Sequence, residues 1–345
     1  MKFKKIVLDE IKRCYCVSHI YAGGELKVVF ASEGIDEPCR AYSGASFENR
    51  EELWKEPGGT MSFVAIPGSD GGFLAIQRAY PRYNMTGVKI VRGRFIKSGC
   101  EIRDFIELPY AHRFDVLESE GRLHFIGATL CNTKREREDW SDPGKLWAGE
   151  LPADFGAPMG LRPIKESLVK NHGYWRGTRD GANTGYIACD SGIYAASPPR
   201  EGRDWQVELI LAGRFSDVAC YDLDGDGADE IAAISPFHGD ELTIRKKTGD
   251  SRYDVAYRYP NPIDTAHALW AGPLNGIPTI IFGIRKMDGE LGYIRYDKNT
   301  GGYRSEIIEK GVGTANVSVI RRAGGDIIAA ANHAKNEAAV YFTVE

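Results

Sequence analysis

The stretch Asp217–Ile234, DVACYDLDGDGADEIAAI, decides the fold. Its two apolar ends are typical of short β-strands, and the acidic, glycine-containing segment between them is typical of a tight turn. Gly185–Ala188 and Thr279–Phe282 are further short apolar segments that follow a turn of the same kind. Because convincing amphipathic helices are missing from the pattern, the sequence predicts an all-β protein.

The frame of strand, turn and strand recurs along the 345 residues. Its seven copies begin near Ser18, Ser62, His112, His172, Asp217, His267 and Asn316. A spacing of about 44 to 60 residues leaves room for four strands in each repeat and is typical of propeller blades. We therefore predict a single seven-bladed β-propeller domain over residues 1–345, with two packed β-sandwiches as the alternative.

The two ends of the chain complement each other. The last repeat, Asn316–Glu345, is short of a strand, whereas residues 3–11 form a predicted strand that has no blade of its own. We expect this N-terminal strand to complete the last blade and close the ring.

Composition narrows the classes of partner and the compartment. The chain has 44 Lys and Arg against 48 Asp and Glu, a net charge of −4, which argues against a nucleic-acid or anionic-membrane protein. No apolar run approaches the ~20 residues of a membrane span, and the N-terminus shows no stretch of signal-peptide length. The seven cysteines are scattered without regular spacing, as reduced thiols would be. We expect a cytoplasmic protein.

The acidic turn has the pattern D-x-D-x-D-G-x-x-E. Alternate carboxylates can converge on one hard cation, and the glycine permits the sharp turn. The sequence predicts one structural Ca²⁺ here, with the alternative that the turn is merely solvated. The predicted ligands are Asp222, Asp224, Asp226, Glu230 and the backbone carbonyl of Ala228.

The stretch Asp217–Ile234 resembles an FG-GAP or VCBS repeat, the blade unit of integrin-like propellers. Such propellers usually carry several calcium loops, whereas only this turn keeps its carboxylates here. Similar seven-bladed propellers include uronate-cleaving polysaccharide lyases and aldos-2-ulose dehydratase. The resemblance implies an enzyme that acts on anionic or oxidised sugars; over the other six repeats it is a likeness of structural pattern only.

The residues that begin the seven repeats are all polar, and three of the seven histidines of the chain are among them. Closure of the ring would bring these residues around one axis at one face, with the acidic turn at the opposite face. We interpret them as the wall of a functional pocket. The alternative is that they cap strand ends and bond to neighbouring blades, as in any propeller.

The loops after the second strand of each repeat reach the same face and carry several cations. The candidate residues of these loops, cationic and aromatic, are Arg78, Tyr80, Arg82, Arg285, His238 and His333, with Lys134, Arg135, Arg137 and Trp140 from the insertion Cys131–Pro143. Cations that gather in a net-acidic protein favour an anionic ligand. Each arginine alone favours the interpretation of a solvated loop charge, and the anionic ligand is inferred only from their convergence on one face.

These residues suit a lyase or dehydratase, which must remove a proton α to a carboxylate or carbonyl and stabilise the enolate. We assign base and acid to His172 and His267, with His112 as a third member. Arg78 or Arg285 would hold the carboxylate, and Tyr80 is a further candidate. Three imidazoles also suit Zn²⁺ or Mn²⁺, with Asp217 as an additional ligand, and the sequence leaves both roles open.

Several enzyme classes have no recognisable signature in this chain, including the Ser-His-Asp triad, the phosphate loop and the dinucleotide fingerprint. The expected partner is a small anionic sugar or oligosaccharide, neither nucleic acid nor membrane. The alternative function is a non-catalytic β-propeller that binds a glycan or a protein.

Overall fold

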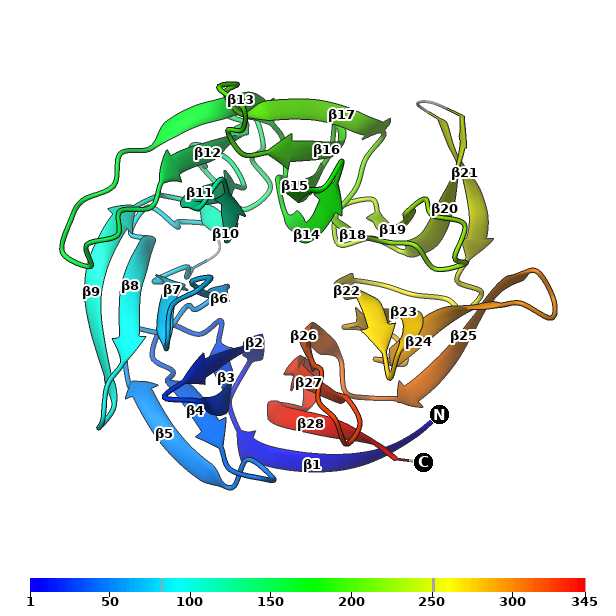
Figure 1. Ribbon diagram of the computed structural model, residues 1–345, viewed down its shortest axis with the longest axis horizontal. Coiled ribbons are helices and arrows are strands. Elements are labelled where there is room, and N and C mark those ends of the chain that lie inside the picture. The colour runs from blue at the N-terminus through cyan, green and yellow to red at the C-terminus, as the bar shows by residue number, and fades with distance from the viewer. Residues whose placement is uncertain (82, 250–251, 345) are drawn as a thin grey trace.

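The computed structural model describes residues 1–81, 83–249 and 252–344. Seven antiparallel four-stranded sheets stand around a central axis as the blades of a propeller (Figure 1). Among the described residues the single helical element is the 3-10 turn η1 (His333–Lys335). No helix in this part of the chain is long and apolar enough to cross a membrane. The predicted all-β, seven-bladed propeller is confirmed.

The blades follow one another in chain order, and in the first six the chain runs from the innermost strand outward. Blade one has β2 (Cys14–Ala22), β3 (Glu25–Ser32), β4 (Cys39–Ser43) and β5 (Asn49–Trp54). Blade two has β6 (Phe63–Ala65), β7 (Gly72–Gln77), β8 (Lys89–Phe95) and β9 (Cys100–Glu107). Blade three has β10 (Ala111–Ser119), β11 (Arg122–Thr129), β12 (Gly144–Glu150) and β13 (Arg162–Leu168).

The second half repeats this order. Blade four has β14 (Gly173–Arg179), β15 (Ala182–Cys189), β16 (Gly192–Ser197) and β17 (Gln206–Ala212). Blade five has β18 (Asp217–Tyr221), β19 (Glu230–Ser235), β20 (Glu241–Gly249) and β21 (Arg252–Arg258). Blade six has β22 (Ala266–Leu274), β23 (Ile277–Ile284), β24 (Leu291–Asp297) and β25 (Gly302–Glu309).

Blade seven joins the two ends of the chain. It has β26 (Thr314–Ile320), β27 (Ile327–Asn332), β28 (Glu337–Val344) and, outermost, the N-terminal strand β1 (Lys2–Glu10). The strands β1 and β28 pair from Lys2↔Val344 to Glu10↔Glu337, and the two termini lie side by side (Figure 1). The prediction that the N-terminal strand closes the ring is confirmed.

The core lies between neighbouring blades. All residues of the second strands β7, β19 and β27 are buried, because both faces of each sheet pack against another blade. Phe73 of β7 stacks on Phe63 with ring centroids 4.5 Å apart. A Cβ at Gly93 would lie 2.3 Å from the Phe73 ring, so only glycine leaves room for this packing.

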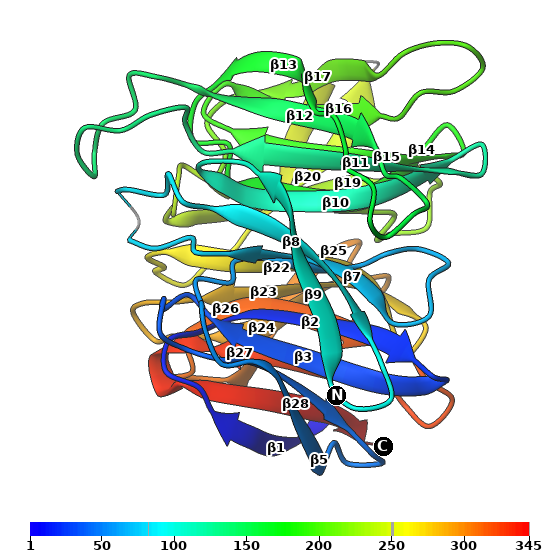
Figure 2. The ribbon, with the colours of Figure 1, turned by 90° about the vertical axis from the view of Figure 1, so that its left-hand side faces the viewer.

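The hairpins divide the loops between two faces (Figure 2). In each of blades one to six the innermost strand begins at one face, turns at the other, and the second strand returns. The starts of β14 and β22 therefore share a face with the loop 236–240 that follows β19. The acidic turn between β18 and β19 lies at the opposite face.

Candidate functional site

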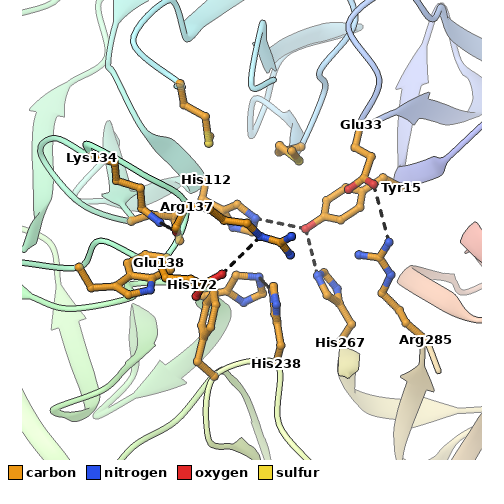
Figure 3. Close-up of a pocket in the computed structure, with 15 residues that line it drawn as sticks. Tyr15, Glu33, His112, Lys134, Arg137, Glu138, His172, His238, His267 and Arg285 are labelled. Atoms are coloured by element: carbon orange, nitrogen blue, oxygen red, sulfur yellow. Dashed lines mark hydrogen bonds and ion pairs between the residues drawn. The ribbon is translucent and has the colours of Figure 1, made fainter. Parts of the chain in front are cut away.

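A cavity of about 230 Å³ opens at the face where the innermost strands begin. Its wall includes Tyr15, His112, His172, His238 and His267, which face one another in Figure 3. These five side chains come from blades one, three, four, five and six, so the cavity exists only because the ring closes.

β-bulges aim three residues into this cavity. In β2 the pairing with β3 passes from Cys14 to Cys16 and leaves out Tyr15. The first pairs of β10 and β22 leave out His112 and His267 in the same way. Because a bulge turns the extra residue away from the sheet, the innermost strands present these side chains to the axis.

Tyr15 joins two of the histidines. Its hydroxyl lies 3.2 Å from Nε2 of His112 and 3.2 Å from Nε2 of His267 (Figure 3). Nδ1 of His267 lies 2.8 Å from the carbonyl oxygen of Ala315 and donates to it, so Nε2 of the neutral ring is an acceptor. The single Tyr15 proton then goes to His267, and the Nε2–H of His112 donates to the Tyr15 oxygen.

His172 is oriented in the same manner. Its Nδ1 donates to the Ser216 carbonyl at 3.0 Å, and its Nε2 lies 3.3 Å from Nε2 of His238. Burial lowers the pKa of His172 well below its ordinary value, and the neighbouring histidines lower it further. Burial and then Arg285 do the same to the pKa of His267. Both rings are therefore neutral at neutral pH.

A buried carboxylate anchors one side of the wall. Glu33 is 1% exposed, and its Oε1 lies 3.0 Å from Arg13 Nη2, 2.9 Å from His333 Nε2 and 3.7 Å from Arg285 Nη2. Arg285 Nη2 also lies 2.6 Å from His333 Nε2. Because Glu33 fixes its position, Arg285 is a pre-placed cation at the edge of the cavity.

The insertion between β11 and β12 supplies further cations. Lys134 and Arg137 line the cavity, and Figure 3 shows Arg137 reaching toward its centre and Lys134 at its edge. Asp142 ties the insertion together by accepting hydrogen bonds from Asn132 at 3.0 Å and Thr133 at 2.7 Å. Lys134 Nζ lies 3.1 Å from the centre of the Trp140 ring, so this ring face is covered by a cation.

The structure separates the predicted site residues. His112, His172, His267 and Arg285 line the cavity. Arg78 is exposed and is not part of the cavity wall. Tyr80 is not in the wall either: its hydroxyl accepts a hydrogen bond from Arg13 at 3.2 Å, and Arg13 in turn pairs with Glu33 of the wall. The candidate Arg82 lies outside the described residues.

The predicted ring of seven polar residues divides into two levels. The three histidines line the cavity, whereas Ser18, Ser62, Asp217 and Asn316 line a deeper space of about 370 Å³ along the axis. The bulges shift the phase, so that Tyr15 rather than Ser18 faces the histidines. The idea that Asp217 joins the histidines around one metal ion is therefore not supported by their placement.

Sequence reasoning left Tyr15 and Glu33 out of the site and gave His238 no role within it. Tyr15 carries no signal, because a bulge cannot be recognised from alternation alone. Glu33 follows β3, and besides Arg13 its partners Arg285 and His333 come from blades six and seven, far away in the sequence. His238 was assigned to the correct loop, and a fourth histidine beside the three predicted ones was the signal that could have given it a role.

The acidic turn holds its own cation. Ligand oxygens of Asp222, Asp224 and Asp226 lie within 4.8 Å of one another, as a calcium site requires. However, Nζ of Lys246 on β20 contacts Asp224 and lies 2.8 Å from Asp226 and 3.7 Å from Glu230. The oxygens fit a hard cation by type, whereas the lysine supplies positive charge at the same place. Calcium therefore stays a prediction, as does the Ala228 ligand.

Comparison with known proteins identifies the architecture. No family model matches the sequence, and no curated protein matches it. The WD40 β-propeller domain of Doa1 superposes with a TM-score of 0.60 at 12% identity, over 99% of this chain and 97% of that chain. The extracellular domain of BT4673 from B. thetaiotaomicron gives 0.62 at 11% identity, over 100% of this chain and 40% of that chain. The chain is thus similar to known β-propellers in fold, and the FG-GAP or VCBS resemblance stays a prediction.

Proposed function

We propose that this protein is a carbon–oxygen lyase or dehydratase that acts on a small anionic or oxidised sugar. The observation that carries the proposal is the Tyr15 hydroxyl, held 3.2 Å from the Nε2 atoms of His112 and His267 in a buried cavity. A phenol between two imidazoles can release and regain a proton at a fixed point. Elimination next to a carbon acid needs such a group.

The reaction moves one proton from carbon to oxygen. The bond from hydrogen to the carbon α to the carboxylate breaks, and its electron pair becomes the new carbon–carbon double bond. The hydrogen-bonded pair of Tyr15 and His267 takes up this proton. A proton from the same pair is then transferred to the leaving oxygen, which keeps the electrons of its bond to carbon. The protein ends the turnover in its starting protonation state.

Binding and charge stabilisation fall to the cations around the cavity. Arg285, held by Glu33, is placed to pair with a substrate carboxylate and to stabilise the negative charge of the enolate. Lys134 and Arg137 line the same cavity and would attract an anionic substrate.

The geometry changes the roles inferred from the sequence. His172 and His267 were the expected base and acid, whereas the contacts favour Tyr15, with His112 and His267 as its partners, as the proton-transfer group. Nε2 of His172 faces His238 instead.

Ultraviolet absorbance tests the proposal. We expect incubation with uronate oligosaccharides or keto-sugars to produce a growing band from a conjugated unsaturated uronate or enone. Tyr15→Phe keeps the ring and removes the proton, so kcat should fall at least about 100-fold. Tyr83→Phe is the control, because Tyr83 is 54% exposed and is not in the cavity wall.

Calorimetric binding of the same saccharide without any growth in absorbance would contradict the proposal. It would favour the alternative of a non-catalytic binding propeller.

A further inference from the structure

We infer that His172, His238 and His267 together bind a divalent transition-metal ion, with zinc as the first candidate. One ring nitrogen from each residue lies within 4.8 Å of the other two. Imidazole nitrogens are the ligands that zinc accepts in open three-histidine sites. The inference goes beyond the proposed elimination and does not depend on it.

Two of the three rings are held as metal ligands are held. Nδ1 of His172 donates to the Ser216 carbonyl at 3.0 Å, and Nδ1 of His267 donates to the Ala315 carbonyl at 2.8 Å. A hydrogen bond from the far nitrogen to a backbone carbonyl fixes the tautomer and orientation of a ligating histidine. The lone pairs of both Nε2 atoms are thereby directed into the cavity.

The third ring comes from a loop that is tied to the first. The backbone N–H of His238 donates to Oγ of Ser216 at 3.0 Å, so one serine holds both His238 and, through its carbonyl, His172. His238 has φ of 50°, a left-handed conformation that costs about 1 kcal/mol or more in a non-glycine residue. Its ring also stacks on Phe237, with centroids 4.1 Å apart. These contacts hold a strained residue with its imidazole facing the other two.

The separation of the nitrogens fits zinc. A tetrahedral ion with Zn–N bonds of about 2.0–2.1 Å places its ligand nitrogens about 3.3–3.4 Å apart. The Nε2 atoms of His172 and His238 are 3.3 Å apart. The longest separation in the group, up to 4.8 Å, needs a shift on the order of 1 Å to reach the same value. The competing interpretation is an ordinary hydrogen bond in which Nε2–H of His238 donates to His172.

The charges around the cluster define what would accompany the ion. Arg285, Lys134 and Arg137 line the same cavity as the carboxylates Glu33 and Glu138, so positive charge is in excess and an anion is the favoured additional ligand. Neutral imidazoles suit zinc better than hard ions, which prefer carboxylate oxygens. We therefore expect the affinity order Zn²⁺, then Mn²⁺, then Ca²⁺. Zinc and the Tyr15 proton compete for the single lone pair of His267 Nε2, so when the ion is bound Tyr15 donates to His112 instead, whose Nε2 must then carry no proton.

Metal binding can be measured without any substrate. The full chain, stripped with a chelator, would be titrated calorimetrically with Zn²⁺, Mn²⁺ and Ca²⁺, and its absorption spectrum recorded with Co²⁺. We expect one zinc ion per chain, bound at least about tenfold more tightly than Mn²⁺, and the visible bands of a tetrahedral cobalt site.

Matched variants locate the ion. His238→Ala should weaken zinc binding at least about tenfold and remove the cobalt bands, and it changes a half-buried loop residue rather than the core. His172→Asn is the second variant. His124→Gln should bind zinc normally, because His124 packs on Trp205 away from the cavity. Asp226→Asn should also bind normally, which excludes the acidic turn.

Two results would overturn the inference: no zinc bound by the stripped wild-type chain, or equal zinc affinity in wild type and His238→Ala. Elimination without zinc binding would contradict this inference alone. Zinc binding without elimination would contradict only the proposed function.

Discussion

Two groups of three side chains, each able to hold a metal ion, lie near opposite ends of the inner strands, and they balance charge in different ways. The histidine group (His172, His238 and His267) comes from three successive blades, and burial keeps His172 and His267 uncharged. The acidic group (Asp222, Asp224 and Asp226) comes from a single turn, with the ammonium of Lys246 among its carboxylates. The number of ligands alone therefore does not decide whether a site needs an ion. The charge that the chain itself supplies also counts.

The largest stability effect should come from the lysine of the acidic group. Lys246→Met leaves Asp224 and Glu230, which are 7% and 1% exposed at their side chains, without this ammonium. Breaking a largely buried ion pair on one side is strongly destabilising, and the part-exposed lysine moderates the loss. We expect the free energy of unfolding to fall by about 2–3 kcal/mol in calcium-free buffer, measured by urea denaturation.

Calcium should then replace the lysine. Millimolar Ca²⁺ should restore most of the lost stability in Lys246→Met and change the wild type little, because in wild type the lysine competes for the same oxygens. Lys247→Met is the control, since Lys247 is exposed on the next position of β20. If calcium stabilised the wild type as strongly as the variant, calcium would displace Lys246 from the carboxylates. The acidic group would then need an ion in spite of its lysine, contrary to the comparison above.

The same two groups show what the sequence could reveal. The acidic turn is contiguous, so its convergence was predictable, and the repeats around it predicted the fold because each blade reuses one strand order. Lys246 was not predictable as a partner, because it lies on β20, two strands out from the axis, and reaches the turn only through the pairing of β19 with β20.

The histidine cavity was predictable only in part. His112, His172 and His267 were found because they begin equivalent strands. Tyr15 was missed because a bulge between Cys14 and Cys16 shifts the phase of β2 relative to simple alternation. Alternation fixes which face of a strand a residue occupies, whereas the level that it reaches along the axis depends on bulges, which are set by tertiary packing.

Asp217 is a third case of charge balance, since its carboxyl is buried along the axis with Arg113 as the nearby cation. Burial raises the pKa of Asp217 to about 7, although Arg113 acts in the opposite direction. The unfolded chain then releases this proton at lower pH than the folded one, so the folded state loses stability as pH rises from about 4 to about 7. Asp217→Asn should remove this loss, so that its advantage over wild type grows from nothing at pH 4 to a few kcal/mol at pH 8.

Thermal unfolding across this pH range checks the expectation. Asp36→Asn is the control, because Asp36 is exposed. A difference between Asp217→Asn and wild type that stays constant from pH 4 to pH 8 would mean that the Asp217 carboxyl ionises normally and that Arg113 is a sufficient partner.

The smallest effect should come from the cations that accompany the neutral histidines. Arg137 lines the cavity, whereas Arg135 in the same insertion does not; both are exposed and each has a carboxylate partner, Glu138 at 3.4 Å and Asp139 at 2.8 Å. If the cavity takes an anion, Arg137→Gln should weaken binding of a uronate oligosaccharide about three- to tenfold, or about 1 kcal/mol, and reduce its dependence on salt. Arg135→Gln carries the same change in net charge and should bind as wild type. Equal losses of affinity in both variants would mean that the insertion attracts the ligand only through its total charge. The position of Arg137 in the cavity wall would then make no separate contribution to binding.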